Sequence, residues 1–159
     1  MLPKLKLLYL CTGNSCRSQM AEGWTRHLEG DRIEPHSAGV DPSTVDPRAV
    51  RVMQEAGVDI SSQSSKRVEE LMDIDFDLVI TVCDHARETC PTLPGAPRSI
   101  HVGFDDPPRM AAHSPDDDEA LDHYRRVRDE IRAFVAELPQ RLEDLAGNDS
   151  PAAGSAKIQ

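Results

Sequence analysis

The sequence predicts a single α/β domain in which a four-stranded parallel sheet is flanked by helices on both faces. Two observations predict this fold class. Short apolar runs alternate along the chain with longer amphipathic segments, which is the order of strands and helices in right-handed crossover units. The length of 159 residues suits one domain, because a chain of this size buries roughly two thirds of the surface that it exposes when unfolded.

The first three elements are expected near the N-terminus. Residues 4–10, KLKLLYL, are a short apolar run that predicts a strand, and residues 18–30 carry apolar side chains at helical spacing. Residues 33–40 predict a weaker strand. Because Pro35 lacks the N–H that a central strand must donate, we expect this strand at the edge of the sheet, beside the first one.

The middle of the chain continues the alternation. A helix is expected over residues 47–57, because proline stands just inside its start and glycine just past its end, and a shorter helix is expected over residues 64–72. Residues 77–82, DLVITV, are a continuous apolar run, which indicates a strand buried on both faces. Residues 98–104 are the fourth predicted strand.

A long amphipathic helix is predicted over residues 117–147, with an apolar stripe along one side. Pro139 should kink or end this helix, because proline lacks the backbone N–H that the helix requires. Residues 147–159 have neither apolar periodicity nor bulk, and we expect them to be disordered. The predicted organisation is therefore one domain over residues 1–146, followed by a tail.

Charge and composition exclude several classes of protein. The chain carries 28 acidic and 18 basic residues, and its net charge of −10 is opposite to that expected of a nucleic-acid-binding protein. Its apolar runs fall far short of the roughly 20 residues that a membrane span requires, and the N-terminus lacks a signal-peptide pattern. The 4 cysteines are too few for a disulfide scaffold. We expect a cytoplasmic monomer with reduced thiols, without nucleic-acid partner, membrane partner or cofactor.

The segment from Cys11 to Ser18, CTGNSCRS, lies between the first predicted strand and the first predicted helix. In such a loop several backbone N–H groups turn inward and, with the helix dipole, form a cradle for a tetrahedral oxyanion. Gly13 would permit a positive φ angle in the tight turn, and Arg17 would hold two anion oxygens. Because positive potential favours the thiolate, we expect a lowered pKa for Cys11, which makes it a nucleophile at neutral pH.

The other loop residues have supporting roles in this interpretation. The phosphate loop of nucleotide-binding proteins is absent, so the cradle should hold a small free or singly esterified oxyanion. Asn14 would brace the loop through bonds to the backbone, and Ser18 would donate to the Cys11 sulfur. Cys16 is interpreted as a bystander, although a side reaction with Cys11 stays open. The predicted oxyanion-binding loop consists of Thr12, Gly13, Asn14, Ser15, Cys16, Arg17 and Ser18.

The motif CTGNSCRS resembles the signature loop of the low-molecular-weight tyrosine phosphatase family, a cysteine followed by five residues and then arginine and serine. The longer stretch CTGNSCRSQMAEGW, together with a distant cysteine pair and GFDDP, looks closer still to the thioredoxin-coupled arsenate reductases. The resemblance covers residues 5–138. It implies a low-molecular-weight tyrosine phosphatase-like fold, a nucleophile at Cys11 and a general acid at Asp106, for which a solvated Asp-Pro turn is the alternative.

Two further cysteines decide between phosphatase and reductase. Cys83 ends the strand predicted at residues 77–82, and Cys90 follows just before a proline. They could be unrelated core residues, and a zinc site is disfavoured because the Cys-x6-Cys spacing matches no common finger. A helical connection would separate the two Cα atoms by about 10 Å. Since a disulfide needs roughly 4.4 to 6.8 Å, the segment would have to unwind to close the bond.

The resemblance implies a sequence of thiol reactions. Cys11 attacks arsenate held by the loop and Arg17, while Asp106 protonates the departing oxygen. Cys83 then attacks the Cys11 sulfur, and arsenite leaves with two electrons from the thiols. Cys90 attacks Cys83, which leaves a disulfide that thioredoxin reduces. The implied function is the reduction of arsenate to arsenite, an arsenic detoxification.

Two alternative functions stay open. The first is a low-molecular-weight phosphatase that acts on phosphotyrosine or small phosphate esters, although an aromatic content of 4% disfavours a phosphotyrosine cleft. The second is an anion-binding or thiol-sensing module without enzymatic activity. A binding module would keep its function when Cys11 is replaced by serine, whereas an enzyme would lose it.

A departure from the family concerns potassium. Some reductases of this type bind potassium behind the loop through Asn, Glu, Ser and Asp side chains. Asn14, Glu22 and Ser37 match three of these positions, but Lys66 stands at the place of the Asp. Because a lysine ammonium could stand where the ion would, we expect no potassium site, and no other spacing in the chain supports a metal.

Overall fold

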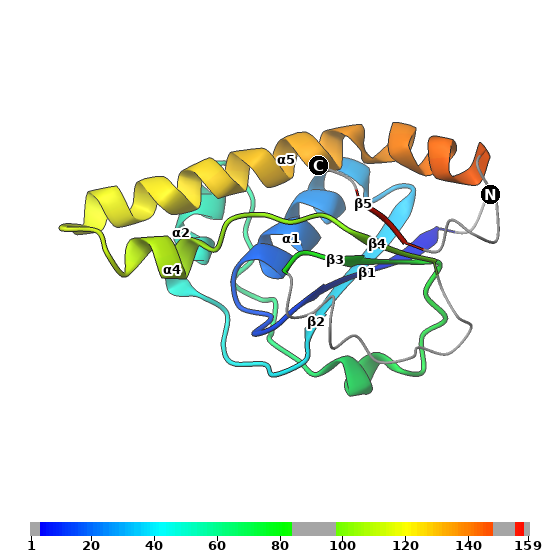
Figure 1. The fold of residues 1–159 in the computed structure, drawn as a ribbon, viewed down its shortest axis with the longest axis horizontal. Helices are drawn as coiled ribbons and strands as arrows, with labels where there is room; N and C mark the ends of the chain where they lie inside the picture. The colour runs from blue at the N-terminus through cyan, green and yellow to red at the C-terminus, as the bar shows by residue number, and fades with distance from the viewer. Residues whose placement is uncertain (1–3, 84–97, 148–154, 158–159) are drawn as a thin grey trace.

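A computed structural model describes residues 4–83, 98–147 and 155–157 of the chain. It contains a five-stranded parallel sheet in the order β2-β1-β3-β4-β5 (Figure 1). The strands are β1 (Leu5–Cys11), β2 (Ile33–Gly39), β3 (Leu78–Thr81), β4 (Arg98–His101) and β5 (Ser155–Lys157). Because the strands are parallel, the carboxyl ends of β1, β3 and β4 lie at one edge of the sheet, where such folds bind ligands.

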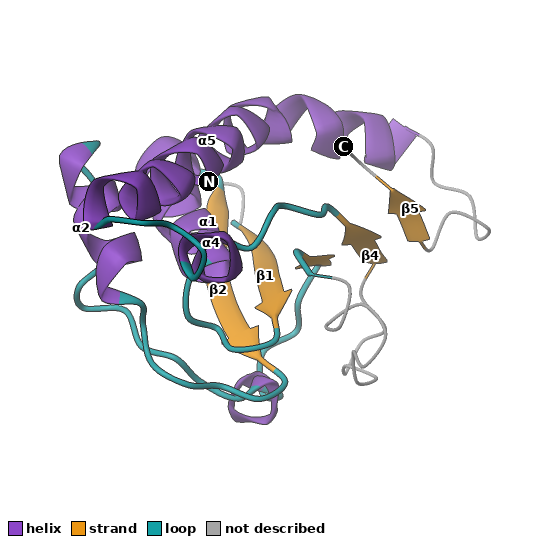
Figure 2. Cartoon of the chain, turned by 60° about the vertical axis from the view of Figure 1, so that its left-hand side comes forward, coloured by secondary structure: helices purple, strands orange, loops and turns teal. Residues whose placement is uncertain are grey.

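The described helices gather mainly on one face of the sheet. Figure 2 shows α1, α2 and α5 together, with α5 packed along α1 and α2, whereas η1 lies at the opposite side. The helices are α1 (Arg17–Glu29), α2 (Pro47–Glu55), the short 3₁₀ helix η1 (Val68–Leu71), α4 (Pro107–Ala111) and α5 (Asp117–Gly147). Among these described helices, none is both long and apolar enough to span a membrane.

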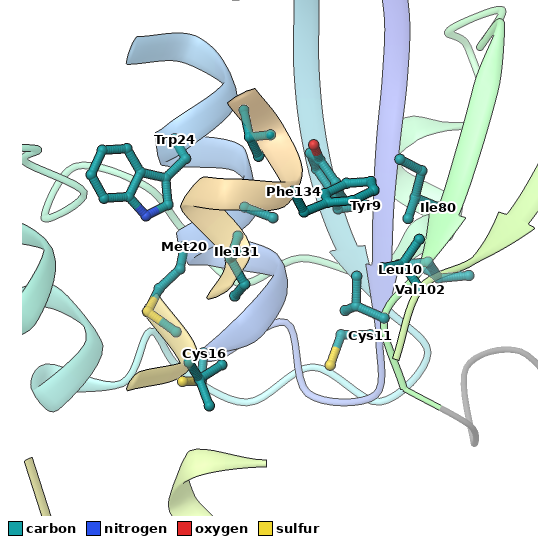
Figure 3. Close-up of a cluster of buried hydrophobic side chains, with 14 of the residues drawn as sticks. Tyr9, Leu10, Cys11, Cys16, Met20, Trp24, Ile80, Val102, Ile131 and Phe134 are labelled. Carbon is teal, nitrogen blue, oxygen red and sulfur yellow. The ribbon is translucent and has the colours of Figure 1, made fainter. Parts of the chain in front are cut away.

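A large part of the core lies between β1 and the two longest helices, α1 and α5. All four residues from Leu7 to Leu10 are fully buried, because β1 has a neighbouring strand on each side and covered faces. Tyr9 and Leu10 belong to one buried cluster with Met20 of α1 and with Ile131 and Phe134 of α5 (Figure 3). Burial of each large apolar side chain stabilises the fold by about 1.5–3 kcal/mol, so this cluster fixes where β1 ends.

The four strands predicted from the sequence are confirmed as β1 to β4. The strand that contains Pro35 is an edge strand next to β1, as expected. The tail differs from its expected disorder, because Ser155–Lys157 pair in parallel with β4, and the rest of the tail lies outside the described residues. Backbone pairing of this kind needs no apolar periodicity, and it covers an edge that β4 would otherwise expose.

The helices differ from the predictions in three details. Pro139 does not end α5, which continues to Gly147, because the fully buried Val135 and Leu138 hold this part of the helix on the core. The predicted helix over residues 64–72 is only the 3₁₀ turn η1. The short α4 was not predicted, and its two prolines at the first helical positions suit a helix start.

Candidate functional site

The loop between β1 and α1 is held from outside through its carbonyl groups. Backbone N–H groups of the segment 40–46, which follows β2, donate to four of these carbonyls. The hydrogen bonds join Val40 to Cys11 at 3.2 Å, Asp41 to Thr12 at 2.9 Å, Ser43 to Gly13 at 3.0 Å and Asp46 to Ser15 at 2.9 Å. The segment 40–46 therefore fixes the orientation of successive peptide groups in the loop.

Each of these carbonyls shares a planar trans peptide with the N–H of the next residue, so that this N–H points to the opposite side. In the part of the chain that the structure describes, no N–H of residues 13–16 donates a hydrogen bond, and α1 begins without a side-chain cap. Orphan N–H groups that converge at a helix N-terminus attract anions. The predicted oxyanion cradle is therefore consistent with the backbone geometry.

Asn14 is the residue that bends the loop. It has a positive φ of 47° and is fully buried. Its Oδ1 accepts the Lys66 N–H at 3.0 Å, and its Nδ2 donates to the Ser18 hydroxyl at 2.9 Å, a partner that the sequence argument did not assign to Ser18. Its carbonyl accepts hydrogen bonds from Gln19 Nε2 and from the Ser65 hydroxyl. The left-handed turn is thus tied to two other segments of the chain.

The expectation that Gly13 supplies the positive φ is wrong, since Asn14 does so. Asparagine tolerates this region because its short side chain can hydrogen-bond locally. A different glycine limits the space behind the loop. A Cβ placed on Gly39, at the end of β2, would lie 2.6 Å from the Thr12 carbonyl oxygen. No local pattern in the sequence indicates this close approach.

Cys11 and Cys83 lie side by side at the carboxyl ends of adjacent strands. The pairing of Leu10 with Thr81 brings the ends of β1 and β3 together. The Thr12 hydroxyl lies 3.2 Å from the Cys83 sulfur, and Cys83 is close enough to Cys11 to be the largest influence on the pKa of that thiol. The fold thus brings together two thiols that lie 72 positions apart in the sequence, Cys11 and Cys83.

The thiol pKa values differ from the prediction. The hydrogen bond to Cys83 and then burial raise the pKa of Cys11 well above its usual value, whereas Arg17 and the Thr12 N–H lower it. The expected lowering is therefore wrong for this arrangement, because sequence reasoning counted the positive groups but not burial and the neighbouring thiol of Cys83. Burial and then the Asp46 carboxylate also raise the pKa of Cys16. Figure 3 shows the Cys16 sulfur directed away from Cys11.

Arg17 reaches from the start of α1 across the ends of two strands. Its Nη1 donates to the Phe104 carbonyl at 3.0 Å and approaches the Val82 carbonyl at 3.5 Å. Its side chain is only 13% exposed, and its Nη2 lies 3.8 Å from Asp106 Oδ1. The guanidinium is thus held by backbone carbonyls beside the loop, where it can stabilise a bound anion.

The two neighbouring aspartates have separate environments. Asp106 precedes α4 and faces Arg17, and its carboxylate makes no capping hydrogen bond. Pro107 and Pro108, the first residues of α4, have no N–H for it to cap. Asp105 instead forms an ion pair with Arg126 of α5 at 3.1 Å. Of the pair, Asp106 is therefore the carboxylate that faces Arg17 beside the loop.

Lys66 and Glu22 form a polar cluster behind the loop. The Lys66 ammonium donates to the carbonyls of Ser37 at 3.2 Å and Ser64 at 2.8 Å. Glu22 accepts from the Ser37 hydroxyl at 2.6 Å and pairs with Arg26 at 2.7 Å. Carbonyl and carboxylate oxygens of this kind also suit a cation, and here the Lys66 ammonium satisfies two of the carbonyls. Across the described residues, no three His, Cys, Asp or Glu side chains gather as metal ligands.

The third thiol of the predicted relay lies outside the described residues. Cys90 belongs to the segment 84–97, which the structure does not describe. The sequence-based expectation that this segment unwinds to bring Cys83 and Cys90 together therefore stays a prediction. The structure brings together the loop, Arg17, Cys83 and Asp106.

Comparison with known sequences identifies close relatives. The sequence profile of the family described as low molecular weight phosphotyrosine protein phosphatase matches residues 6–147. An arsenate reductase of Halalkalibacterium halodurans is 45% identical over 128 residues, which cover 80% of this chain and 90% of that protein. The resemblance noted in the motifs thus extends over most of the chain.

Solved structures give the same result. A structure described as an arsenate reductase in the phosphate binding state has a TM-score of 0.65 and 32% identity, covering 86% of this chain and 98% of that one. The thioredoxin-dependent arsenate reductase of Corynebacterium glutamicum has a TM-score of 0.64 and 25% identity, covering 89% of this chain and 63% of that one. The fold and the motif therefore point to the same group of proteins.

Proposed function

Since this chain belongs to the low molecular weight phosphotyrosine protein phosphatase family, in the branch of the arsenate reductases, we propose that it reduces arsenate to arsenite with electrons from thioredoxin. The observation that carries the proposal is the position of Cys83 beside the oxyanion loop, at the end of the strand next to Cys11, where its sulfur lies 3.2 Å from the Thr12 hydroxyl. A phosphatase needs one thiol there. With a second thiol within reach, the two thiols can form a disulfide and together supply the two electrons that reduction of arsenic requires.

Arsenate binds to the loop N–H groups and the Arg17 guanidinium in this scheme. A dianionic arsenate can take the proton of the Cys11 thiol as it enters, which offsets the raised pKa of this thiol. The Cys11 thiolate then forms a bond to arsenic, and one arsenate oxygen leaves as water with a proton from Asp106. Arsenic stays pentavalent in this step, and the product is a covalent thiol–arsenate adduct.

Reduction occurs when the second thiol attacks. The Cys83 thiol, held beside Cys11 and near the Thr12 hydroxyl, gives its proton to an oxygen of the adduct and forms a disulfide with Cys11. The electron pair of the broken sulfur–arsenic bond goes to arsenic, which leaves as arsenite. Because Cys11 and Cys83 already lie at the carboxyl ends of adjacent strands, little rearrangement of the chain is needed for this bond.

The relay to thioredoxin completes the cycle. Cys90 attacks Cys83, frees Cys11 and leaves a Cys83–Cys90 disulfide, which thioredoxin reduces by thiol exchange. The similarity to a thioredoxin-dependent reductase supports this step. The same proposal places the protein in the cytoplasm, because a thioredoxin-coupled cycle requires a reducing compartment. It also includes a monomer whose catalytic domain spans residues 1–146.

The test is arsenate-dependent oxidation of NADPH in the presence of thioredoxin and thioredoxin reductase. We expect the wild-type chain to turn over repeatedly and the variants Cys11→Ser, Cys83→Ser and Cys90→Ser to lose turnover. A single-turnover assay separates the three roles. Cys90→Ser should release one arsenite per chain and keep a Cys11–Cys83 disulfide, whereas Cys83→Ser should release none.

Two results would contradict the proposal. Mass spectrometry of wild-type chain treated with arsenate alone should find the Cys83–Cys90 disulfide, and a product that links other thiols would refute the relay. If the chain hydrolyses small phosphate esters but reduces no arsenate, the phosphatase alternative holds, because the loop and Asp106 suffice for that reaction. Loss of hydrolysis in Cys11→Ser would then exclude a pure binding module.

A further inference from the structure

Asp46 connects the oxyanion loop to the helical layer. It stands at the N-cap position of α2, where its Oδ1 accepts the Arg48 N–H at 2.9 Å. Its own N–H donates to the Ser15 carbonyl at 2.9 Å. Its Oδ2 accepts the Tyr124 hydroxyl of α5 at 2.5 Å. One residue thus contacts the loop, a helix start and the long helix.

The Tyr124 hydroxyl is a fixed anchor for this carboxylate. Tyr124 is 2% exposed and lies within the apolar stripe of α5, which packs on α1 and α2. Burial and then the hydrogen bond to Asp46 raise the pKa of Tyr124 above its usual value, so that the hydroxyl keeps its proton and donates it. The position of the Asp46 backbone is therefore set by the core.

The hydrogen bond from the Asp46 N–H to the Ser15 carbonyl links this anchor to the oxyanion loop. Because the Asp46 N–H holds that carbonyl outward, the N–H of Cys16 in the same peptide points to the opposite side. Cys16 is the N-cap residue of α1, and no side chain caps this helix. Its N–H is therefore among the donors available to an oxyanion, and its direction depends on where Asp46 lies.

We propose that Asp46, anchored by Tyr124, is a positioning residue that aims the Cys16 N–H at the bound oxyanion. The proposal rests on the proposed function only in requiring that an oxyanion binds in the loop. Neither Asp46 nor Tyr124 touches the reacting atoms. Their effect should therefore appear in anion affinity rather than in the chemical step.

The test compares wild-type chain with Tyr124→Phe, Asp46→Asn and Asp46→Ala. Calorimetry with inorganic phosphate gives the dissociation constant, and turnover with arsenate gives KM and kcat. In Tyr124→Phe the loss of one hydrogen bond should raise the phosphate Kd and the arsenate KM together by about fivefold, with kcat changed by less than about twofold. Asp46→Ala, which also loses the cap of α2, should raise both constants further.

Asp46→Asn is the conservative variant. Its side-chain oxygen can still accept the Arg48 N–H, and its nitrogen can donate to the Tyr124 oxygen, so that most of the wild-type affinity should return. Tyr9→Phe is the matched control. It removes the other tyrosine hydroxyl of the chain, which lies 2.7 Å from Thr25 Oγ1 in the core, away from the segment 40–46. It should lower the melting temperature and leave the phosphate Kd unchanged.

The outcomes decide the proposal separately from the proposed function. Equal phosphate Kd values for wild type, Tyr124→Phe and Asp46→Ala would overturn it, as would a Tyr9→Phe variant that weakens phosphate binding as much as Tyr124→Phe. If the wild type binds phosphate but reduces no arsenate, the proposed function fails and the phosphate comparison still decides the role of Asp46. A wild type that binds no phosphate overturns the positioning role as well.

Discussion

Replacing Gly39 with alanine would disturb the oxyanion loop from behind without changing any loop side chain. A Cβ on Gly39 would lie 2.6 Å from the Thr12 carbonyl oxygen and 3.0 Å from the Asn14 nitrogen. Ordinary van der Waals contact begins at 3.4 Å, so the Thr12–Gly13 peptide would have to retreat from 2.6 Å to 3.4 Å. The backbone itself must move, because no flexible side chain can yield instead.

The expected magnitude follows from this retreat. Because the Gly13 N–H points to the opposite side from the Thr12 carbonyl, a shift of about 0.8 Å would push it into the cradle, where it crowds an oxyanion that needs a donor distance of about 2.9 Å. Complete loss of one oxyanion donor costs about 10²- to 10³-fold in rate, and with partial relaxation we expect kcat/KM for arsenate to fall by about 10- to 100-fold. Overpacking should also lower the unfolding free energy by about 1–3 kcal/mol.

The assay needs a glycine control that strains the chain elsewhere. Gly57 has a φ of 86°, and a Cβ added there would have no heavy atom within 4 Å, so Gly57→Ala adds backbone strain of about 1 kcal/mol without a clash near the loop. Differential scanning calorimetry should show a lower melting temperature for both variants, while only Gly39→Ala loses kcat/KM. A Gly39→Ala variant with wild-type kcat/KM, or an equal activity loss in Gly57→Ala, would refute the reasoning.

Three further predictions concern the thiol pair, the cation cluster and the acid. In Cys83→Ala the largest cause of the raised pKa of Cys11 is gone. The pH midpoint of Cys11 alkylation by iodoacetamide should therefore move to lower pH. An unchanged midpoint would argue against an influence of Cys83 on the Cys11 thiol. Because the Lys66 ammonium already satisfies two carbonyls, turnover should be equal in potassium and sodium buffers of the same ionic strength, and several-fold activation by potassium would contradict this. Asp106→Asn should slow formation of the thiol–arsenate adduct in rapid-quench experiments, and an unchanged rate would assign the proton donor to another group.

Local patterns were sufficient to predict the frame of the site. Two apolar runs end at Cys11 and Cys83, and a parallel sheet brings the carboxyl ends of its strands to one edge. The junction of strand, loop and helix around Arg17 likewise follows from neighbouring residues. These features were predictable because each depends on periodicity or spacing within a few turns of chain.

The features that determine the shape of the loop were not predictable in this way. The close approach of Gly39, the left-handed turn at Asn14 and the anchor from Tyr124 to Asp46 depend on segments that are distant in sequence. The pKa of Cys11 was mispredicted for the same reason, because its largest cause is a thiol from another strand. Long-range packing leaves no trace in local periodicity.

An oxyanion loop made mainly of peptide N–H groups selects its ligand by size and charge and by little else. Phosphate and arsenate are both tetrahedral dianions, so the metabolic phosphate of a cell would compete for the loop at every encounter. Discrimination would then come after capture, from the step in which a neighbouring sulfur donates electrons, since arsenic accepts them and phosphorus does not. The abundant anion would slow such a protein without ever becoming its product.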